Sequence, residues 1–257
     1  MEWNKIKTIL IVVFAVVNIF LFFVYYGGFD NGALSDELVA QTVEVLELNN
    51  VGIDARLLKN NYESIKVCNV ENSYANVKDV LDATLYQNSV LSGEIDTTRH
   101  SFTFVPDEGS SFYGLPSSRA EKALKESGLL ADVSYRKEQA EDGIYFYLKF
   151  EGKVFFDSYI FVRTKDDKIV SISAYNMLGD TVSEGSLAET VSLPEILINF
   201  ATENSSQSRI DIVGLRTGYY VGTRGETVRV TAAPVWQIKT ADNKVFYYDM
   251  RNGDLLK

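Results

Sequence analysis

The chain has 257 residues, of which 46% are hydrophobic and 12% aromatic, so it can bury a sizeable core and is not disordered throughout. Its net charge of −10 argues against nucleic acid or an anionic lipid surface as a partner, because either would repel an acidic protein. Cys68 is the only cysteine and His100 the only histidine, which excludes an intramolecular disulfide and leaves no set of zinc ligands.

The first predicted element is a transmembrane helix at residues 9–27, which contain no charged side chain. An apolar run of about 18 residues rises about 27 Å as a helix, close to the hydrocarbon thickness of a bilayer. Lys5 and Lys7 precede it, so the positive-inside rule places residues 1–8 in the cytoplasm and the remaining chain outside the cell. A cleaved signal peptide is the alternative, but the bulky Tyr25 lies where such a peptide carries small residues. The sequence predicts an uncleaved, single-pass protein of the cell membrane.

An asparagine lies near the middle of this predicted span. An unpaired amide is costly in hydrocarbon, so Asn18 is expected to hydrogen-bond across to another helix, or else to its own backbone. The residues on the same helical face form the candidate partner-binding face of the span: Ile11, Phe14, Ala15, Asn18, Leu21, Phe22 and Tyr25.

A glycine-rich hinge at residues 28–34 separates the span from the first external helix. That helix begins after Ser35, a good N-cap, and its apolar spacing continues to about residue 48. Residues 65–70 alternate between apolar and polar types and predict a strand, and residues 77–85 have the spacing of a second helix.

Residues 95–105 predict another strand, which Pro106 stops. Ser118 and Glu121 have the spacing of a capping box, so a helix is expected at residues 119–127. An antiparallel meander with short turns follows, with strands at residues 144–150, 154–162 and 170–174.

A boundary is predicted at residues 179–185, beyond which the order of elements repeats. Ser192 and Glu195 form a second capping pair, and the helix after them should reach about residue 204. Four strands follow, near residues 210–221, 227–233, 235–240 and 244–249.

The expected fold is therefore α+β, with an N-terminal transmembrane helix followed by two small extracytoplasmic lobes. Lobe 1 spans residues 35–182 and lobe 2 spans residues 183–257, and in each a helix packs on an antiparallel β-meander.

Few residues carry a pattern of catalytic chemistry. Ser134 and Lys137 fit the Ser-x-x-Lys pattern of penicillin-interacting enzymes, but the stretch leads into strands and the downstream Lys-Thr-Gly element is absent. His100 alone cannot build a triad. We therefore expect no enzyme activity, no metal and no cofactor. The tyrosines of the strands are either a recognition surface or ordinary half-buried positions: Tyr145, Tyr147, Tyr219, Tyr220, Tyr247 and Tyr248.

The N-terminus carries a resemblance to a known family. Met1-Glu2-Trp3, Lys5, Lys7-Thr8-Ile9 and the later Asn18-Ile19-Phe20-Leu21 resemble the start of YycI proteins, whose usual pattern is M-D-W-x-K-x-K-T-I, an apolar run and L-N-x-F-L. Glu2 replaces the usual Asp and Val17 the usual Leu. A C-terminal strand pair of the type Pro-x-Trp…Tyr-Tyr…Gly agrees with the same family. In this reading Trp3, Lys5 and Lys7 mark the cytoplasmic boundary of the membrane.

This resemblance implies a membrane-anchored accessory protein of the essential WalK/WalR (YycG/YycF) two-component system, which controls cell-wall homeostasis in low-GC Gram-positive bacteria. The implied partners are the sensor histidine kinase WalK/YycG and the membrane-anchored protein YycH. Two alternatives stay open. One is a ligand-binding module with a cleft near residues 179–185, and the other is an anchored inhibitor or enzyme assembled from distant residues.

Overall fold

The computed structural model describes residues 34–60, 62, 65–71, 93–96, 101–130, 133–176, 182–187, 190–204, 208–222 and 229–257. The expected cytoplasmic tail, transmembrane span and helix at 77–85 lie outside this range, as does almost all of the expected hinge. No helix among the described residues has the length and apolarity needed to span a membrane.

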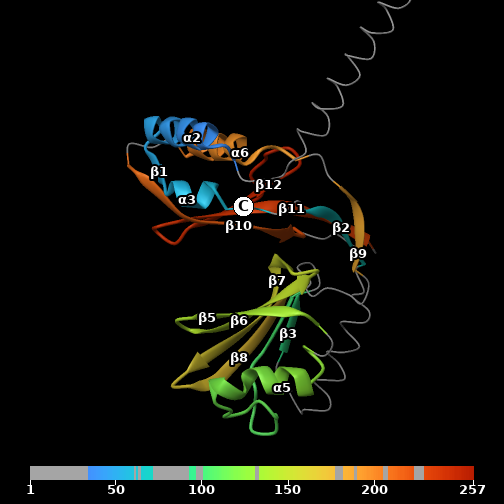
Figure 1. Ribbon diagram of the computed structural model, residues 1–257. Coiled ribbons are helices and arrows are strands. Elements are labelled where there is room, and N and C mark those ends of the chain that lie inside the picture. Colours follow the sequence, from blue (N-terminus) through green and yellow to red (C-terminus); the bar gives the residue numbers. More distant parts are fainter. Residues whose placement is uncertain are drawn as a thin grey trace, which may run out of the picture.

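The fold is mixed α+β, as expected, and is dominated by a curled β-sheet with a few helices (Figure 1). The described helices are α2 (Asp36–Leu48), α3 (Ala55–Leu58), the 3₁₀ helix η1 (Ser117–Arg119), α5 (Ala120–Glu126) and α6 (Leu193–Glu203). The described strands are β1 (Val51–Ile53), β2 (Lys66–Glu71), β3 (Gly93–Asp96), β4 (Ser101–Phe104), β5 (Tyr135–Ala140), β6 (Gly143–Phe150), β7 (Lys153–Lys165), β8 (Lys168–Tyr175), β9 (Val182–Leu187), β10 (Ile210–Tyr220), β11 (Arg229–Thr240) and β12 (Val245–Asp249). The main path through the sheet is β3-β4-β8-β7-β10-β11-β2-β9.

Two predicted helix starts are confirmed by their caps. Ser35 accepts a hydrogen bond from the Leu38 N–H at 3.3 Å at the start of α2. Ser192 accepts one from the Glu195 N–H at 3.4 Å at the start of α6. Each bond satisfies a backbone donor that has no partner inside the helix, which is why both helices begin where the sequence indicates.

The capping box predicted at Ser118 is wrong. A 3₁₀ turn, η1, precedes α5, and α5 has no side-chain cap. The carboxylate of Glu121 instead accepts a hydrogen bond from the Tyr135 hydroxyl at 2.5 Å and one from Lys137 Nζ at 3.2 Å. Glu121 therefore connects α5 to β5. Its carboxylate is used in this tertiary contact and not in a capping box at the start of the helix.

Replacing Tyr135 by Phe should raise the pKa of Glu121 toward its ordinary value. The Tyr135 hydroxyl is the main cause that holds this pKa low; burial acts in the opposite direction, and Lys137 adds a smaller lowering. A carboxyl group whose pKa is lower in the folded protein than in the unfolded chain stabilises the fold at pH values above the unfolded-state pKa. This stabilisation is lost as the pH falls through the folded-state pKa. The Tyr135→Phe variant should therefore lose less stability on acidification than the unsubstituted chain. ¹³C NMR titration of the Glu121 carboxyl measures the pKa directly, and Tyr113→Phe is the control. An unchanged pKa would assign the shift to Lys137 and Lys125.

The predicted meander is confirmed as β6, β7 and β8, which pair antiparallel in chain order. Its two turns adopt the left-handed backbone region at Glu151-Gly152 (φ 46° and 81°) and Asp166-Asp167 (φ 51° and 61°). Tight hairpins need such dihedral angles, and Gly and Asp tolerate them better than most residues.

Two strands predicted on either side of Pro234 form one strand, β11. Up to Ala232 this strand pairs with β2, and from Val235 onward it pairs with β12. On this edge of β11, Pro234 falls between the two pairings, so its missing N–H breaks no ladder there, and its carbonyl accepts a bond from the Met250 N–H at 2.8 Å. On the other edge Pro234 lies opposite Tyr219 of β10.

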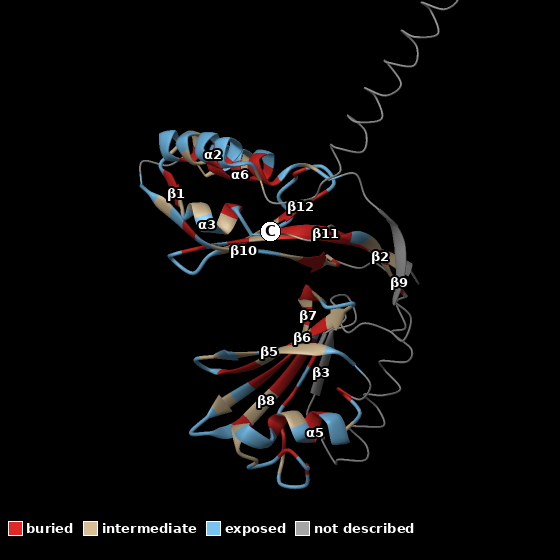
Figure 2. Cartoon of the chain, viewed as in Figure 1, coloured by how far each residue is buried: buried red, intermediate tan, exposed pale blue. Residues whose placement is uncertain are grey.

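Two hydrophobic cores organise the described chain (Figure 2). We call the first the terminal core, because α2 to β2 pack in it together with α6, β10, β11 and β12. The second, the central core, is formed by α5 and strands β4, β6, β7 and β8. Figure 1 shows α2 and α6 over one end of the molecule and α5 at the other.

The terminal core combines residues from both expected lobes. The short strand β1 pairs parallel with β10, and α2 lies against α6, so residues 36–71 share a core with residues 193–250 rather than with the rest of the expected lobe 1 (35–182). The described residues of the expected lobe 2 (183–257) therefore pack mainly in a core that they share with residues 36–71. Its sheet needs the apolar faces of α2 and α3 to cover it.

Candidate functional site

Strand β7 passes from one core to the other. Its early residue Phe155 is fully buried in the terminal core, whereas Ile160 is fully buried in the central core. Between them the register with β6 is irregular: Tyr147 faces Tyr159 and Lys149 faces Val154, so five steps along β7 oppose two along β6. This bulge turns β7 away from β6 and lets it pair with β10.

The pairing of β7 with β10 is parallel and short. Val154 lies opposite Gly218, and Phe155 lies opposite Tyr219. A Cβ at Gly218 would lie 2.5 Å from the Val154 carbonyl oxygen and 2.6 Å from a ring carbon of Phe156, so this approach requires glycine.

A carboxylate in the bulge holds the end of β10. Asp157 accepts hydrogen bonds from the N–H groups of Val221 (3.0 Å) and Gly222 (2.7 Å). It also accepts one from Asn176 Nδ2, at the end of β8, at 3.1 Å. The two cores are thus joined by a strand pairing and by one acidic side chain.

Tyrosines cover one face of strands β6, β7 and β8, which we call the central sheet. This face lies opposite α5 and points away from the central core. Tyr147 of β6, Tyr159 of β7 and Tyr175 of β8 form a row across the strands, with ring centroids 5.5 Å and then 4.9 Å apart. Tyr145 lies beside this row, 5.5 Å from Tyr147 and 4.4 Å from the buried ring of Phe161. Period-two alternation explains the arrangement, because Ile144, Phe146 and Leu148 point into the central core between these tyrosines.

The row continues onto the sheet of the terminal core. The Tyr247 ring of β12 lies 5.4 Å from Phe156 of β7 and 5.2 Å from Tyr220 of β10. A small cluster of Val154, Phe156, Ala233 and Val235 packs against Tyr147, Tyr220 and Tyr247. We call the whole set the tyrosine surface: Tyr145, Tyr147, Tyr159, Tyr175, Tyr220 and Tyr247.

Three arginines near this surface are paired with carboxylates of the chain itself. Arg216 of β10 meets Glu138 of β5 at 3.0 Å, which is a contact between the two cores. Arg136 meets the same carboxylate at 3.0 Å, and Arg163 lies 3.7 Å from Asp142. The guanidiniums of Arg136 and Arg216 thus share one carboxylate, and each of these three guanidiniums is engaged by a carboxylate of the chain itself.

Burial raises the pKa of each tyrosine of the tyrosine surface for which a shift is resolved. The pKa is raised most for Tyr147 and Tyr159. Neighbouring carboxylates act in the same direction, Asp142 on Tyr145 and Glu138 on Tyr147. These phenols therefore stay neutral in the physiological range, where they can donate and accept hydrogen bonds but cannot act as phenolate nucleophiles.

The structure separates the tyrosines singled out from the sequence. Tyr145, Tyr147, Tyr220 and Tyr247 lie on the tyrosine surface, whereas Tyr219 and Tyr248 are core residues whose hydroxyls bond Lys66 O (3.0 Å) and Glu203 Oε2 (2.6 Å). Tyr159 and Tyr175 were missed. Their signal was present, since Tyr159 follows the alternation of β7 and Tyr175 is the last residue of β8.

Other sequence candidates do not assemble into a reactive site. Lys137 Nζ lies 3.2 Å from Glu121, so it does not activate Ser134, and Cys68 is buried in the terminal core. Within the described ranges no group of three or more His, Cys, Asp or Glu could hold a metal ion. His100 lies outside those ranges, and so do the predicted membrane residues, which remain predictions: Trp3, Lys5, Lys7, Ile11, Phe14, Ala15, Asn18, Leu21, Phe22 and Tyr25.

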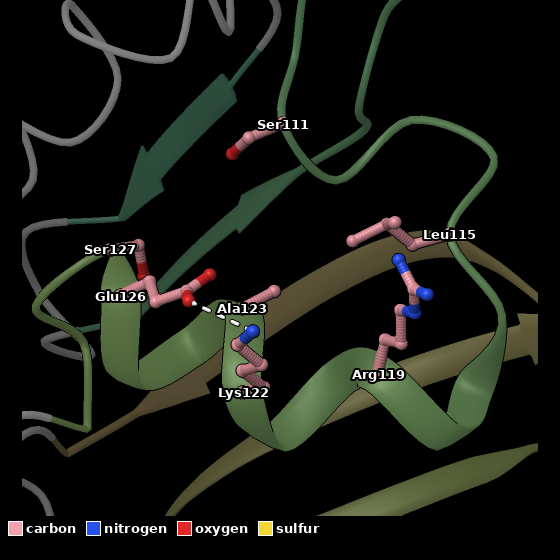
Figure 3. A pocket seen from close by; sticks show the side chains of 7 residues that line it. All are labelled: Ser111, Leu115, Arg119, Lys122, Ala123, Glu126 and Ser127. Atoms are coloured by element: carbon pink, nitrogen blue, oxygen red, sulfur yellow. Dashed lines mark ion pairs between the residues drawn. The ribbon is translucent and has the colours of Figure 1, made fainter.

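A hollow of about 390 Å³ lies beside α5, remote from the tyrosine surface (Figure 3). In it Lys122 pairs with Glu126 at 3.5 Å, and the Ser127 hydroxyl donates to the Leu124 carbonyl at 3.0 Å. The hollow thus contains a surface ion pair and a hydroxyl bonded to its own helix, neither of which forms a nucleophile with its base. The ligand cleft expected near residues 179–185 stays a prediction, because 177–181 lie outside the described ranges.

The fold and this surface define a mixed α+β protein with two cores and an aromatic surface across their junction. The family model described as "YycI protein" matches residues 33–249, and the chain belongs to the YycI family. This is a family of regulatory accessory proteins, and membership indicates a role in the YycG/WalK system.

A crystal structure of an uncharacterized protein from Eubacterium rectale ATCC 33656 is similar at 10% identity and a TM-score of 0.39, covering 76% of this chain and 86% of that chain. The comparison with curated proteins gave no match.

Proposed function

We propose that this protein is a non-enzymatic regulator of the sensor histidine kinase WalK/YycG, acting through contacts of a transmembrane helix and of the external domain. The support is the family match, which spans nearly all of the described fold. In this proposal the protein crosses the cell membrane once, with residues 1–8 in the cytoplasm and the α+β domain outside, and a YycH-like protein acts with it.

The physical mechanism is a bias on a kinase with two signalling states. A regulator shifts that equilibrium only by the difference between its affinities for the two states. A difference of roughly 1–3 kcal/mol changes the ratio of states by about 5- to 150-fold. Affinity that is equal for both states would leave kinase output unchanged.

Within the membrane, Asn18 is the residue expected to contribute most to the contact with kinase helices. Asn18→Leu should weaken co-purification of the full chain with the kinase by roughly 3- to 30-fold, since an interhelical hydrogen bond of an amide is worth roughly 0.6–2 kcal/mol. Quantitative pull-down from membranes measures this.

The matched control is Val17→Leu, which lies off the predicted face and keeps the span apolar. It should leave association unchanged, and both variants should retain the urea unfolding transition of the external domain. Equal recovery of kinase with Asn18→Leu and with the unsubstituted chain would remove Asn18 from the contact.

A further inference from the structure

The residue types of the tyrosine surface are those that dominate protein–protein contacts. Tyr and Arg are enriched among the residues that contribute most to binding energy, and such residues cluster at the centre of interfaces. Here six tyrosines lie on one contiguous surface, with Arg136, Arg163 and Arg216 around them. Ring–ring contacts hold most of these side chains in place, so ordering them costs little on binding.

The ion pairs around the surface restrict the kind of partner. Around the surface each guanidinium is already paired with a carboxylate, while the chain as a whole carries −10. A charged partner face would have to compete with these ion pairs, and breaking one of them leaves a charge without its partner. The complementary face is therefore an uncharged one.

The geometry restricts the mode of contact. The tyrosines lie on the face of a paired sheet, since β6, β7 and β8 already have their neighbours. A partner cannot add a strand there, so recognition rests on side chains and on the phenol hydroxyls.

We propose that the tyrosine surface is the site at which an uncharged, apolar-rich face of a partner protein's external domain docks. This inference rests on the proposed function, because it names the external contact of the same regulator. Because Tyr147 and Tyr159 belong to the central sheet and Tyr220 and Tyr247 to the terminal one, the docked partner contacts both cores at once. Docking therefore fixes how the cores sit relative to each other.

The test introduces a charge into the surface. Tyr175→Asp places a carboxylate at a side chain that is 37% exposed, so the fold is retained, and an unpaired charge facing an uncharged partner is strongly unfavourable. The matched control is Tyr113→Asp, the same change at a tyrosine that is 52% exposed and lies outside the surface. Each full-length variant is expressed in membranes with the kinase and the YycH-like protein, cross-linked, and the recovered partner is quantified.

Recovery of at least one of these two partners should fall roughly tenfold or more with Tyr175→Asp and stay unchanged with Tyr113→Asp. With the unsubstituted chain it should persist when ionic strength rises from about 0.1 M to about 0.5 M, because paired rim charges give no net attraction to screen. The double variant Tyr147→Ser/Tyr159→Ser should act in the same direction.

Several results would overturn the proposal. Equal loss in Tyr175→Asp and Tyr113→Asp would show that charge matters but location does not. Cross-links to a second copy of this chain alone would make the surface a self-association face. Full recovery with Tyr175→Asp together with loss in Asn18→Leu would end the docking inference and leave the regulator intact, whereas no recovery of either partner with the unsubstituted chain would end the proposed function itself.

Discussion

Replacing Phe155 by Ala should lower the free energy of unfolding by about 3–5 kcal/mol. Phe155 is fully buried, and its ring stacks on that of Tyr219 with centroids 5.0 Å apart. It belongs to β7, whose later residues build the central core, yet it fills space in the terminal core. Truncation would therefore open a cavity at the place where the two cores are joined.

Urea unfolding of the full chain in detergent, followed by tryptophan fluorescence, measures this loss. Trp236 is buried in the terminal core beside Tyr62 and reports on that core directly. Phe155→Leu is the matched control, since it keeps most of the apolar volume and should cost clearly less. A loss below about 1 kcal/mol for Phe155→Ala would mean that the site collapses around the missing ring and that the junction is looser than its packing indicates.

Local chemistry was enough to predict elements whose signals lie within a few residues. Ser35 and Ser192 each supply an oxygen to a backbone N–H three residues later, and the helices begin there. The turn at Asp166-Asp167 likewise depends on left-handed dihedral angles, which Asp tolerates better than most residues. The contact that decides the division into cores is of another kind, because Val51 pairs with Ile210 across most of the chain. No local pattern records such a pairing.

Strand β5 was not predicted, because its sequence carries no local signal for a strand. Its sequence, Tyr-Arg-Lys-Glu-Gln-Ala, has almost no apolar alternation. It forms a strand because β6 offers a partner edge and because Glu138 and Lys137 find partners in Arg216 and Glu121. Tertiary contacts supply what the intrinsic propensity of the segment does not.

The sequence could predict that some strand tyrosines lie on the surface, but it could not predict which ones. Adjacent residues on a strand point to opposite faces, so each of the pairs Tyr219-Tyr220 and Tyr247-Tyr248 must divide between core and surface. The sequence does not decide which member faces the core, because both flanks of each pair contain apolar residues. The structure decides it through helices α2 and α6, which cover the face on which Tyr219 and Tyr248 lie.

Gly218→Ala should destabilise the junction of the cores by about 2–3 kcal/mol, at the upper end of the usual cost of overpacking. The added Cβ would lie 2.5 Å from the Val154 carbonyl oxygen, and a backbone atom within a paired strand cannot move aside as a flexible side chain can. β10 would have to separate from β7, which carries Tyr220 away from the tyrosines of the central sheet. Partner recovery should fall with stability, although no ring of the tyrosine surface has been changed.

Gly214→Ala on the same strand is the matched control. A Cβ there would meet only the Lys239 Cβ, at an ordinary contact distance of 3.7 Å, and the smaller conformational freedom of Ala in the unfolded chain should leave stability unchanged or slightly raised. Urea unfolding and the cross-linking assay are applied to both variants. Together they distinguish the effect of the close approach between β10 and β7 at Gly218 from the general effect of losing a glycine. Equal behaviour of the two variants would mean that the cores adjust freely at their junction, and a docked partner could then not fix their arrangement through Gly218.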